Sequence, residues 1–262
     1  MKIIDFFHFS ILNKNEEDLF KLSYVKFIRF LEALNFKKAS HYVIPIFDNS
    51  ILKQKKFINF FKSNLNSNKF SFLFMPNLKS KTLEIDLLNI KKLGFKGIVF
   101  HPYLQKNDSI NKNILQIIKF CKKNNIFICV CCAYGSKDIY TIYPLKLVSE
   151  IAKIFDGKII IIHSGGLKIF ESMLLAEAHK NIYLETSFSL LYWKNSSIEK
   201  DFGYVYQKIG AKKIIFGSDN PFMDMNESIK FKKYFFKKNQ FSKNDLSKIF
   251  YKNAQNFIKN DK

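Results

Sequence analysis

Short runs of apolar, mostly β-branched or aromatic residues alternate with segments of helical spacing from one end of the chain to the other. Each run is four to seven residues long, which is typical of a buried strand rather than of a helix. The pattern predicts eight strands, at residues 2–7, 41–47, 70–75, 97–101, 126–132, 158–162, 182–185 and 213–217.

Helix-length segments lie between these runs. Their ends carry capping signals: Asn15 with acidic residues before the first helix, Gly94 after another, and Ser242 with Asp245 in capping-box spacing before the last. The predicted helices are 16–34, 82–93, 113–123, 144–155, 167–179 and 198–209, a lysine- and asparagine-rich helix and loop within 53–69, and two more that finish the chain.

Eight strands that are each followed by a helix predict a (β/α)8 barrel, whose usual size is about 250 residues. We therefore expect one TIM-like barrel domain over residues 1–262, with an open doubly wound sheet as the alternative fold. The sequence contains no repeat of fixed period and no low-complexity linker that would divide it.

Composition supports a soluble globular protein. The chain is 47% hydrophobic, and its longest apolar run, 126–134, is about half of the ~18 residues that a membrane span needs. Asp5 interrupts the apolar N-terminal stretch, and no small-residue cleavage site follows it. We expect a cytoplasmic protein without a membrane partner.

The formal net charge of +21 does not by itself indicate a nucleic-acid partner. Arg29 is the only arginine, so the other 42 basic residues are lysines. Proteins that read nucleic acids favour arginine, whose planar fork binds phosphates and base edges bidentately. The excess fits codons rich in A and T and solvated helix faces, including the amphipathic segment 231–238, and leaves only salt-dependent attraction to polyanions open.

The four cysteines are crowded into residues 121–132, and three of them lie on one predicted strand. Cys129 and Cys132 match C-x-x-C, but an offset of three on a strand points the two thiols to opposite faces. Buried core cysteines are therefore favoured over a redox or zinc-ribbon motif.

Position along a strand sorts the polar candidates, because active sites of this barrel lie at the carboxyl ends of the strands. His41 and His179 fall at the opposite end and are expected to be structural. The residues at or just past a carboxyl end are His8, His101, Cys132, His163 and Asp219. Among them, His101, His163 and Asp219 form a plausible catalytic group from three strands.

Six segments resemble the successive strand-end motifs of the amidohydrolase-related family, whose members are TIM-barrel enzymes related to aminocarboxymuconate-semialdehyde decarboxylase. They occur in the right order over nearly the whole chain, at residues 3–6, 94–102, 161–166, 181–187, 215–222 and 253–254.

The resemblance implies one divalent metal, usually zinc, that activates water for hydrolysis of an amide, lactone or related bond, or that assists a decarboxylation. It implies that Asp219 is a metal ligand and the general base, that His163 lies near metal or substrate, and that His101 lines the pocket. The expected partner is a small carbonyl or carboxylated compound, with homodimers common in the family. Residues expected to contact the substrate are Tyr103, Ser187 and Asn220.

The first strand departs from the family pattern. The family places histidines two and four residues after the aspartate, but counting from Asp5 these positions hold Phe7 and Phe9. His8 has the opposite parity, so in a regular strand it points towards the helices, and only a bulge would bring His8 and Ser10 inside.

Strand five departs as well. The family offers a histidine before a glycine, whereas this chain has Cys131-Cys132-Ala133-Tyr134-Gly135, in which either thiolate could bind zinc. The provisional ligand set is therefore His163, Asp219, His8 and Cys132, and the cofactor is one zinc or none. The alternatives are a metal-independent lactonase-like hydrolase or carboxy-lyase, and a degenerate barrel that only binds a ligand.

Overall fold

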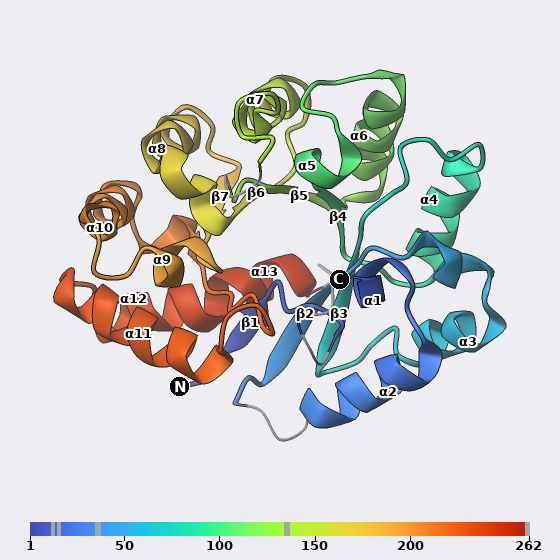
Figure 1. The fold of residues 1–262 in the computed structure, drawn as a ribbon, viewed down its shortest axis with the longest axis horizontal. Coiled ribbons are helices and arrows are strands. Elements are labelled where there is room, and N and C mark those ends of the chain that lie inside the picture. Colours follow the sequence, from blue (N-terminus) through green and yellow to red (C-terminus); the bar gives the residue numbers. More distant parts are fainter. Residues whose placement is uncertain (12–13, 15–16, 35–37, 134–136, 260–262) are drawn as a thin grey trace.

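The computed structural model describes residues 1–11, 14, 17–34, 38–133 and 137–259. Within these residues, eight parallel strands pair in sequence order, and helices surround them (Figure 1). The strands are β1 Ile4–Phe6, β2 His41–Ile46, β3 Phe70–Phe74, β4 Gly97–Phe100, β5 Phe127–Cys131, β6 Ile159–Ile162, β7 Ile182–Glu185 and β8 Ile214–Ile215.

The first and last strands approach each other and bring the sheet round on itself. The backbone N–H of Phe6 donates to the carbonyl of Phe216, just past β8, over 3.2 Å. The sequential strand order and this contact are those of a TIM barrel, so the predicted (β/α)8 fold is confirmed.

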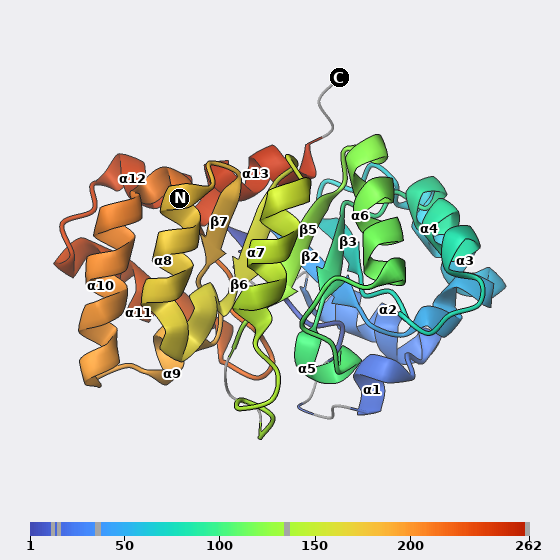
Figure 2. The ribbon, with the colours of Figure 1, turned by 90° about the horizontal axis from the view of Figure 1, so that it is seen from above.

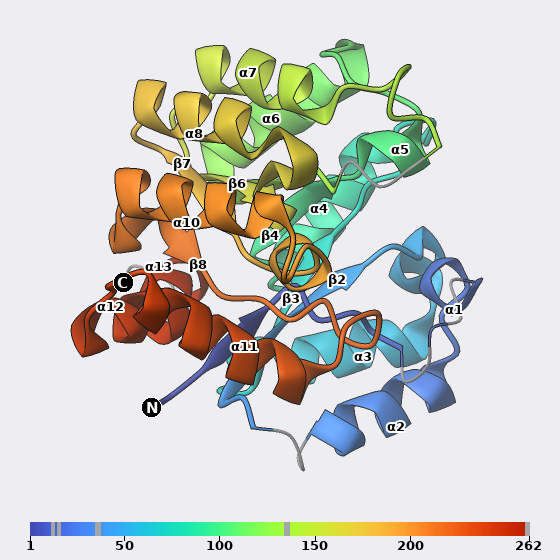
Figure 3. The ribbon, with the colours of Figure 1, turned by 60° about the vertical axis from the view of Figure 1, so that its left-hand side comes forward.

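Most predicted helices are present and cover the outside of the barrel, and shorter helices lie at its two ends. The helices that cover the barrel are α2 Tyr24–Ala33, α3 Lys55–Ser63, α4 Leu83–Lys92, α6 Lys112–Asn124, α7 Pro144–Ile154, α8 Ile169–Ala178, α10 Ser197–Ile209 and α11 Met225–Lys238. Helices α7, α8, α10 and α11 follow one another around the outside (Figure 3). The short helices α1 Glu17–Phe20, α5 Pro102–Gln105 and α9 Ser189–Tyr192 lie at one end, and α13 Asn253–Ile258, preceded by α12 Lys243–Ser247, lies at the other (Figure 2).

The single helix predicted for 16–34 is wrong, because the chain forms α1 and α2 with a break between them. At the break, the backbone N–H of Leu22 donates to the Asp48 carboxylate over 2.7 Å, and Ser23 is extended, with ψ of 128°. An N–H that bonds a side chain from another part of the fold cannot continue a helix. The predicted cap, Asn15, lies outside the described residues.

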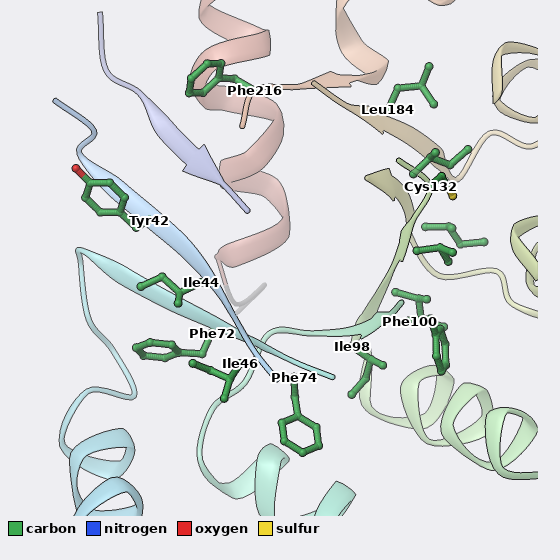
Figure 4. Close-up of a cluster of buried hydrophobic side chains, with 14 of the residues drawn as sticks. Tyr42, Ile44, Ile46, Phe72, Phe74, Ile98, Phe100, Cys132, Leu184 and Phe216 are labelled. Atoms are coloured by element: carbon green, nitrogen blue, oxygen red, sulfur yellow. The ribbon is translucent and has the colours of Figure 1, made fainter. Parts of the chain in front are cut away.

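Two hydrophobic cores follow from the alternation of side chains along the strands. The outer core lies between strands and helices; Tyr42, Phe72, Phe100, Leu184 and other residues of this core point away from the barrel centre (Figure 4). The inner core takes the alternate residues, such as Val43, Leu73, Val99, Cys129 and Ile160. All four cysteines are buried as free thiols, as predicted. No helix within the described ranges is long and apolar enough to cross a membrane.

Candidate active site at the carboxyl end of the barrel

Three predicted polar residues lie directly after strands of the same barrel. His101 follows β4, His163 follows β6, and Asp219 lies four residues beyond the end of β8. Because the strands are parallel, all three are at the same end. His163 and Asp219 are buried, with 5% and 4% of their surface exposed, and His101 is partly buried.

A β-bulge at the end of β1 decides which side chains enter this site. The backbone N–H groups of Phe7 and His8 both donate to the carbonyl of Val43, each over 3.0 Å, so two residues face one. Phe7 has a φ of 69°, in the left-handed region. As a result Phe6, Phe7 and Phe9 all belong to the inner core.

The bulge is therefore present, but its effect is opposite to the one considered from sequence. With Ile4 and Phe6 facing inwards, a regular strand would also have placed His8 inside. Instead His8 contacts the rings of Phe30 and Tyr42 in the outer core, at centroid distances of 5.8 and 5.2 Å. Its Nδ1 lies 2.6 Å from Oδ2 of Asp5, and its Nε2 has no hydrogen-bond partner in the described part of the chain.

Aromatic rings occupy the space that the missing histidines would take. Phe7 packs edge-on against Phe9 and against His163, at 5.3 and 5.8 Å between ring centroids. Phe9 also contacts Phe47 and Phe222, at 5.7 and 5.0 Å. We call Phe7, Phe9, Phe47 and Phe222 the mouth cluster.

The residues present do not fit the metal that the family implies. A catalytic zinc uses three protein ligands. Among the described residues, no three His, Cys, Asp or Glu side chains come together in a way that could hold an ion. The side chains of His8 and Cys132 both pack in the outer core, and the provisional four-residue set is not assembled. Tyr134 and Gly135 of the strand-five motif lie outside the described residues.

Asp219 nevertheless has an unused acceptor. Its Oδ1 is buried and makes no hydrogen bond to any described residue. Burial is the largest influence on this carboxyl and raises its pKa well above the usual value, and the nearby charges of Glu185 and Asp5 act in the same direction, against Lys232. A raised pKa makes the ionised carboxylate a stronger proton acceptor.

His163 is linked to β7 by a chain of short hydrogen bonds. Its Nδ1 lies 2.8 Å from the Ser187 hydroxyl, and that hydroxyl donates to Oε2 of Glu185 over 2.6 Å. Backbone N–H groups of Ser187 and His163 donate to the two Glu185 oxygens, over 2.7 and 3.2 Å. Glu185 is fully buried, so these bonds compensate for its loss of hydration.

A buried lysine from α11 neutralises the acids behind the site. The ammonium of Lys232 donates to the carbonyl of Gly217 over 2.6 Å and lies over the ring of Phe216. Burial lowers the pKa of Lys232, while the charges of Glu185, Asp5 and Asp219 oppose that effect. Burial raises the pKa of Glu185, against the Ser187 hydrogen bond and the charge of Lys232.

Both histidines of the site are neutral at physiological pH. Burial lowers the pKa of His163 to about 3, although its contact with the Ser187 backbone acts in the opposite direction. Repulsion from His101, when that ring is protonated, and from Lys232 lowers this pKa further. Burial lowers the pKa of His101 to about 4. Nδ1 of His101 accepts the N–H of Leu104 over 3.4 Å, so the proton of this ring is on Nε2.

The three residues expected to contact substrate have different surroundings. Tyr103 is buried on α5, with its ring 6.5 Å from that of His101. Asn220 is partly buried, and its amide donates to the carbonyl of Met223 over 3.2 Å. Ser187 is fully buried between Glu185 and His163, which makes it a support for His163.

Sequence reasoning missed Asp5, Glu185 and Lys232 as site residues. Asp5 and Glu185 stood in the matched motifs but received no role. Lys232 is one of 42 lysines, yet helical spacing from Ile229 and to Phe236 puts it on the buried face of α11. That periodicity is the signal that could have identified it.

Comparison with known proteins agrees with this architecture. A family model described as amidohydrolase matches residues 69–259. No curated protein sequence matches the chain. Similar solved structures include a probable 2-pyrone-4,6-dicarboxylic acid hydrolase from Acinetobacter baumannii with citric acid bound, at 15% identity and a TM-score of 0.68, covering 98% of this chain and 99% of that one.

Two decarboxylases are also similar in fold. The 2,6-dihydroxybenzoate decarboxylase from Rhizobium is 12% identical, with a TM-score of 0.63 and 98% of both chains covered. A dihydroxybenzoic acid decarboxylase from Polaromonas sp., with bound manganese and the inhibitor 2-nitroresorcinol, is 14% identical, with a TM-score of 0.59 and coverage of 98% and 96%. The family model spans well over half of the chain, from β3 to α13, and this protein belongs to the amidohydrolase family.

Proposed function

We propose that this protein is a metal-independent hydrolase of a small carbonyl compound, such as a lactone or an amide. The observation that carries the proposal is Asp219, a buried carboxylate at the carboxyl end of the barrel whose Oδ1 has no partner among the described residues. No donor set among the described residues fits a metal, and we therefore assign the base to a side chain of the protein.

The reaction needs one base and one hydrogen-bond donor. Asp219 Oδ1 takes a proton from water while the water oxygen attacks the carbonyl carbon. The Nε2–H of His101 donates to the carbonyl oxygen, on which negative charge develops. When the tetrahedral intermediate collapses, the C–O or C–N bond breaks and the leaving group takes the proton back from Asp219.

Replacement of Asp219 tests this mechanism. With the chelator-treated protein and a panel of lactones and amides, Asp219→Asn should lower kcat by at least about 100-fold, because the variant keeps the shape but loses the base. Asp224→Asn is the matched control: Asp224 is exposed on the same loop, and asparagine also caps α11. It should leave kcat unchanged.

Three results would contradict the proposal. Turnover that survives Asp219→Asn excludes this base, and activity lost to chelator but restored by zinc indicates the metal-dependent alternative. Release of CO2 from a carboxylated substrate without hydrolysis indicates a carboxy-lyase.

The mouth cluster favours a second candidate, a barrel that binds a ligand without turning it over. Phe7 and Phe9 are 0% and 7% exposed, so rings cover part of the space above the strands. Saturable binding of a planar ligand, with no conversion by the wild-type protein and equal affinity in Asp219→Asn, would support this candidate over the hydrolase.

A further inference from the structure

The ring of His163 is held in one orientation by two aromatic neighbours. Phe7, just after β1, and Phe188, in the loop after β7, contact this ring. Each lies 5.8 Å from it between ring centroids, with interplanar angles of 89° and 67°. The backbone of His163 has a φ of 63°, so the chain turns sharply as it leaves β6. A ring fixed in this way has a distinct environment at each of its two nitrogens.

The contacts of His163 Nδ1 identify that nitrogen as a donor. Besides the Ser187 hydroxyl at 2.8 Å, Nδ1 lies 3.3 Å from the Ser187 carbonyl oxygen. A carbonyl oxygen only accepts, so this contact is favourable only when Nδ1 carries the proton.

The contacts of Glu185 fix the direction of its hydrogen bond with the Ser187 hydroxyl. Both carboxylate oxygens of Glu185 already accept a backbone N–H, Oε1 from Ser187 and Oε2 from His163. The contact of 2.6 Å between Oε2 and the Ser187 hydroxyl then needs the hydroxyl as donor. The hydroxyl's lone pair is left for the Nδ1–H of His163.

We propose that Glu185 and Ser187 hold His163 as the Nδ1–H tautomer, so that its Nε2 is an unprotonated acceptor. Both are positioning residues, because they act through His163 and not on substrate. Only the role of Nε2 as an acceptor in the reaction rests on the proposed function.

An acceptor at Nε2 narrows the chemistry of the ligand. His163 takes a hydrogen bond from water or from a hydroxyl or N–H of the substrate, and it cannot donate to a carbonyl oxygen. Donation to the carbonyl falls to His101, whose Nδ1 accepts the N–H of Leu104 and whose Nε2 therefore carries the proton. The two imidazoles of the site are thus held in opposite tautomers.

Long-range ¹H–¹⁵N correlation spectra of the ligand-free protein test the tautomer directly. The signals of His163 are assigned by their loss in His163→Gln. In the wild-type protein, we expect Nδ1 to give the protonated and Nε2 the unprotonated type of ¹⁵N shift, with at least about a tenfold excess of this tautomer. An equal mixture, or an excess of the Nε2–H form, would overturn the proposal.

Three variants test the two positioning residues. Glu185→Gln puts an amide NH₂ where one oxygen accepts, so the tenfold excess should be lost. Ser187→Ala should lose part of it and Ser187→Thr, which keeps the hydroxyl, should retain it. Glu199→Gln removes another buried carboxylate, on α10, and should change nothing. An unchanged tautomer ratio in both Glu185→Gln and Ser187→Ala would also overturn the proposal.

The spectra are recorded without substrate, so they test the tautomer of His163 separately from the proposed hydrolase function. The tautomer can be as we propose in a protein that turns over no lactone or amide, in which case the proposed function fails alone. Turnover that depends on Asp219 with His163 in the other tautomer would refute only the role of Glu185 and Ser187.

Discussion

Burial acts in opposite directions on the acids and the imidazoles of this site. It raises the pKa of Asp219 because a carboxylate loses hydration, and it lowers the pKa values of His163 and His101 because an imidazolium does. Each group is shifted towards its neutral form. The carboxyl therefore becomes a stronger proton acceptor, while the histidines stay neutral hydrogen-bonding groups throughout the physiological range.

His101 should make the protein less stable as the solution is acidified. Its pKa is lowered from 6.5 to about 4 on folding, so between these values the unfolded chain binds more protons. The stabilisation is complete above pH 6.5 and is lost as the pH falls towards 4. Its size is at most about 3 kcal/mol. Urea unfolding from pH 7.5 to 4.5 measures it, and His101→Gln should show a shallower loss; equal slopes would contradict the assignment.

Gly217 should tolerate no side chain. A Cβ there would lie 2.0 Å from the Phe6 carbonyl oxygen and 2.0 Å from Oε1 of Glu185. We expect Gly217→Ala to lower the free energy of unfolding by roughly 3 kcal/mol or more, measured by urea denaturation. Gly210→Ala is the control: its φ is +78°, but nothing lies within 4 Å of the new Cβ, so the expected cost is about 1 kcal/mol. Similar losses in both variants would show that contact at Gly217 is not the cause.

At the scale of the element, the bulge in β1 explains why one strand of the barrel carries no polar site residue inward. The positive φ at Phe7 is unusual for a bulky aromatic residue, and histidine is among the residues more often found there. The inner positions that Phe7 and Phe9 now fill therefore suit the pair of histidines that the family pattern places there.

Restoring that pair should create a metal site. In Phe7→His combined with Phe9→His, one imidazole would project beside His163, which Phe7 now contacts. The other would start from residue 9, whose backbone N–H donates to the carbonyl of Asn220, next to Asp219. We expect the double variant to retain about one zinc per chain after dialysis, measured by elemental analysis, and the wild-type protein to retain markedly less. Adding Asp219→Asn should remove the gain. Equal zinc in the wild-type protein would show that other residues bind it.

The strands were predictable to within a few residues because each is a compact apolar run. The site was less predictable, because alternation gives parity only while a strand is regular. The bulge at Phe7 interrupts this alternation, and no residue type within 4–10 predicts it. The opposite error occurred at the first helix, where continuous helical spacing concealed the break at Ser23, which depends on Asp48 from the loop after β2.

At the scale of the molecule, the fold was predictable because it depends on a repeated pattern and not on particular residues. Identities of 12–15% accompany coverage of nearly whole chains among the similar structures. Roles of single residues could not be predicted in the same way. Glu185 and Lys232 act through charge and hydrogen bonds between segments that are far apart in the sequence, and those contacts exist only in the folded barrel.

The lysines behind the net charge of +21 have different roles at the surface and in the interior. Most lysines with ion-pair partners in the described ranges are exposed, as in the pairs of Lys26 with Asp18 and Lys122 with Asp156. Such pairs contribute little to stability. Lys232 is fully buried, and its charge lies among Asp5, Glu185 and Asp219. One lysine out of 42 therefore matters to the site more than the total does.

The bulge in β1 also decides which of two neighbouring side chains faces the barrel mouth. If residues 4–9 formed a regular strand, the alternation of Ile4 and Phe6 would bring His8 inwards and turn Phe9 towards the helices. The backbone conformation at Phe7 thus separates a mouth lined by phenylalanine from one lined by imidazole. In barrels of this kind, the loss or gain of a bulge can change the available chemistry without any substitution at the site.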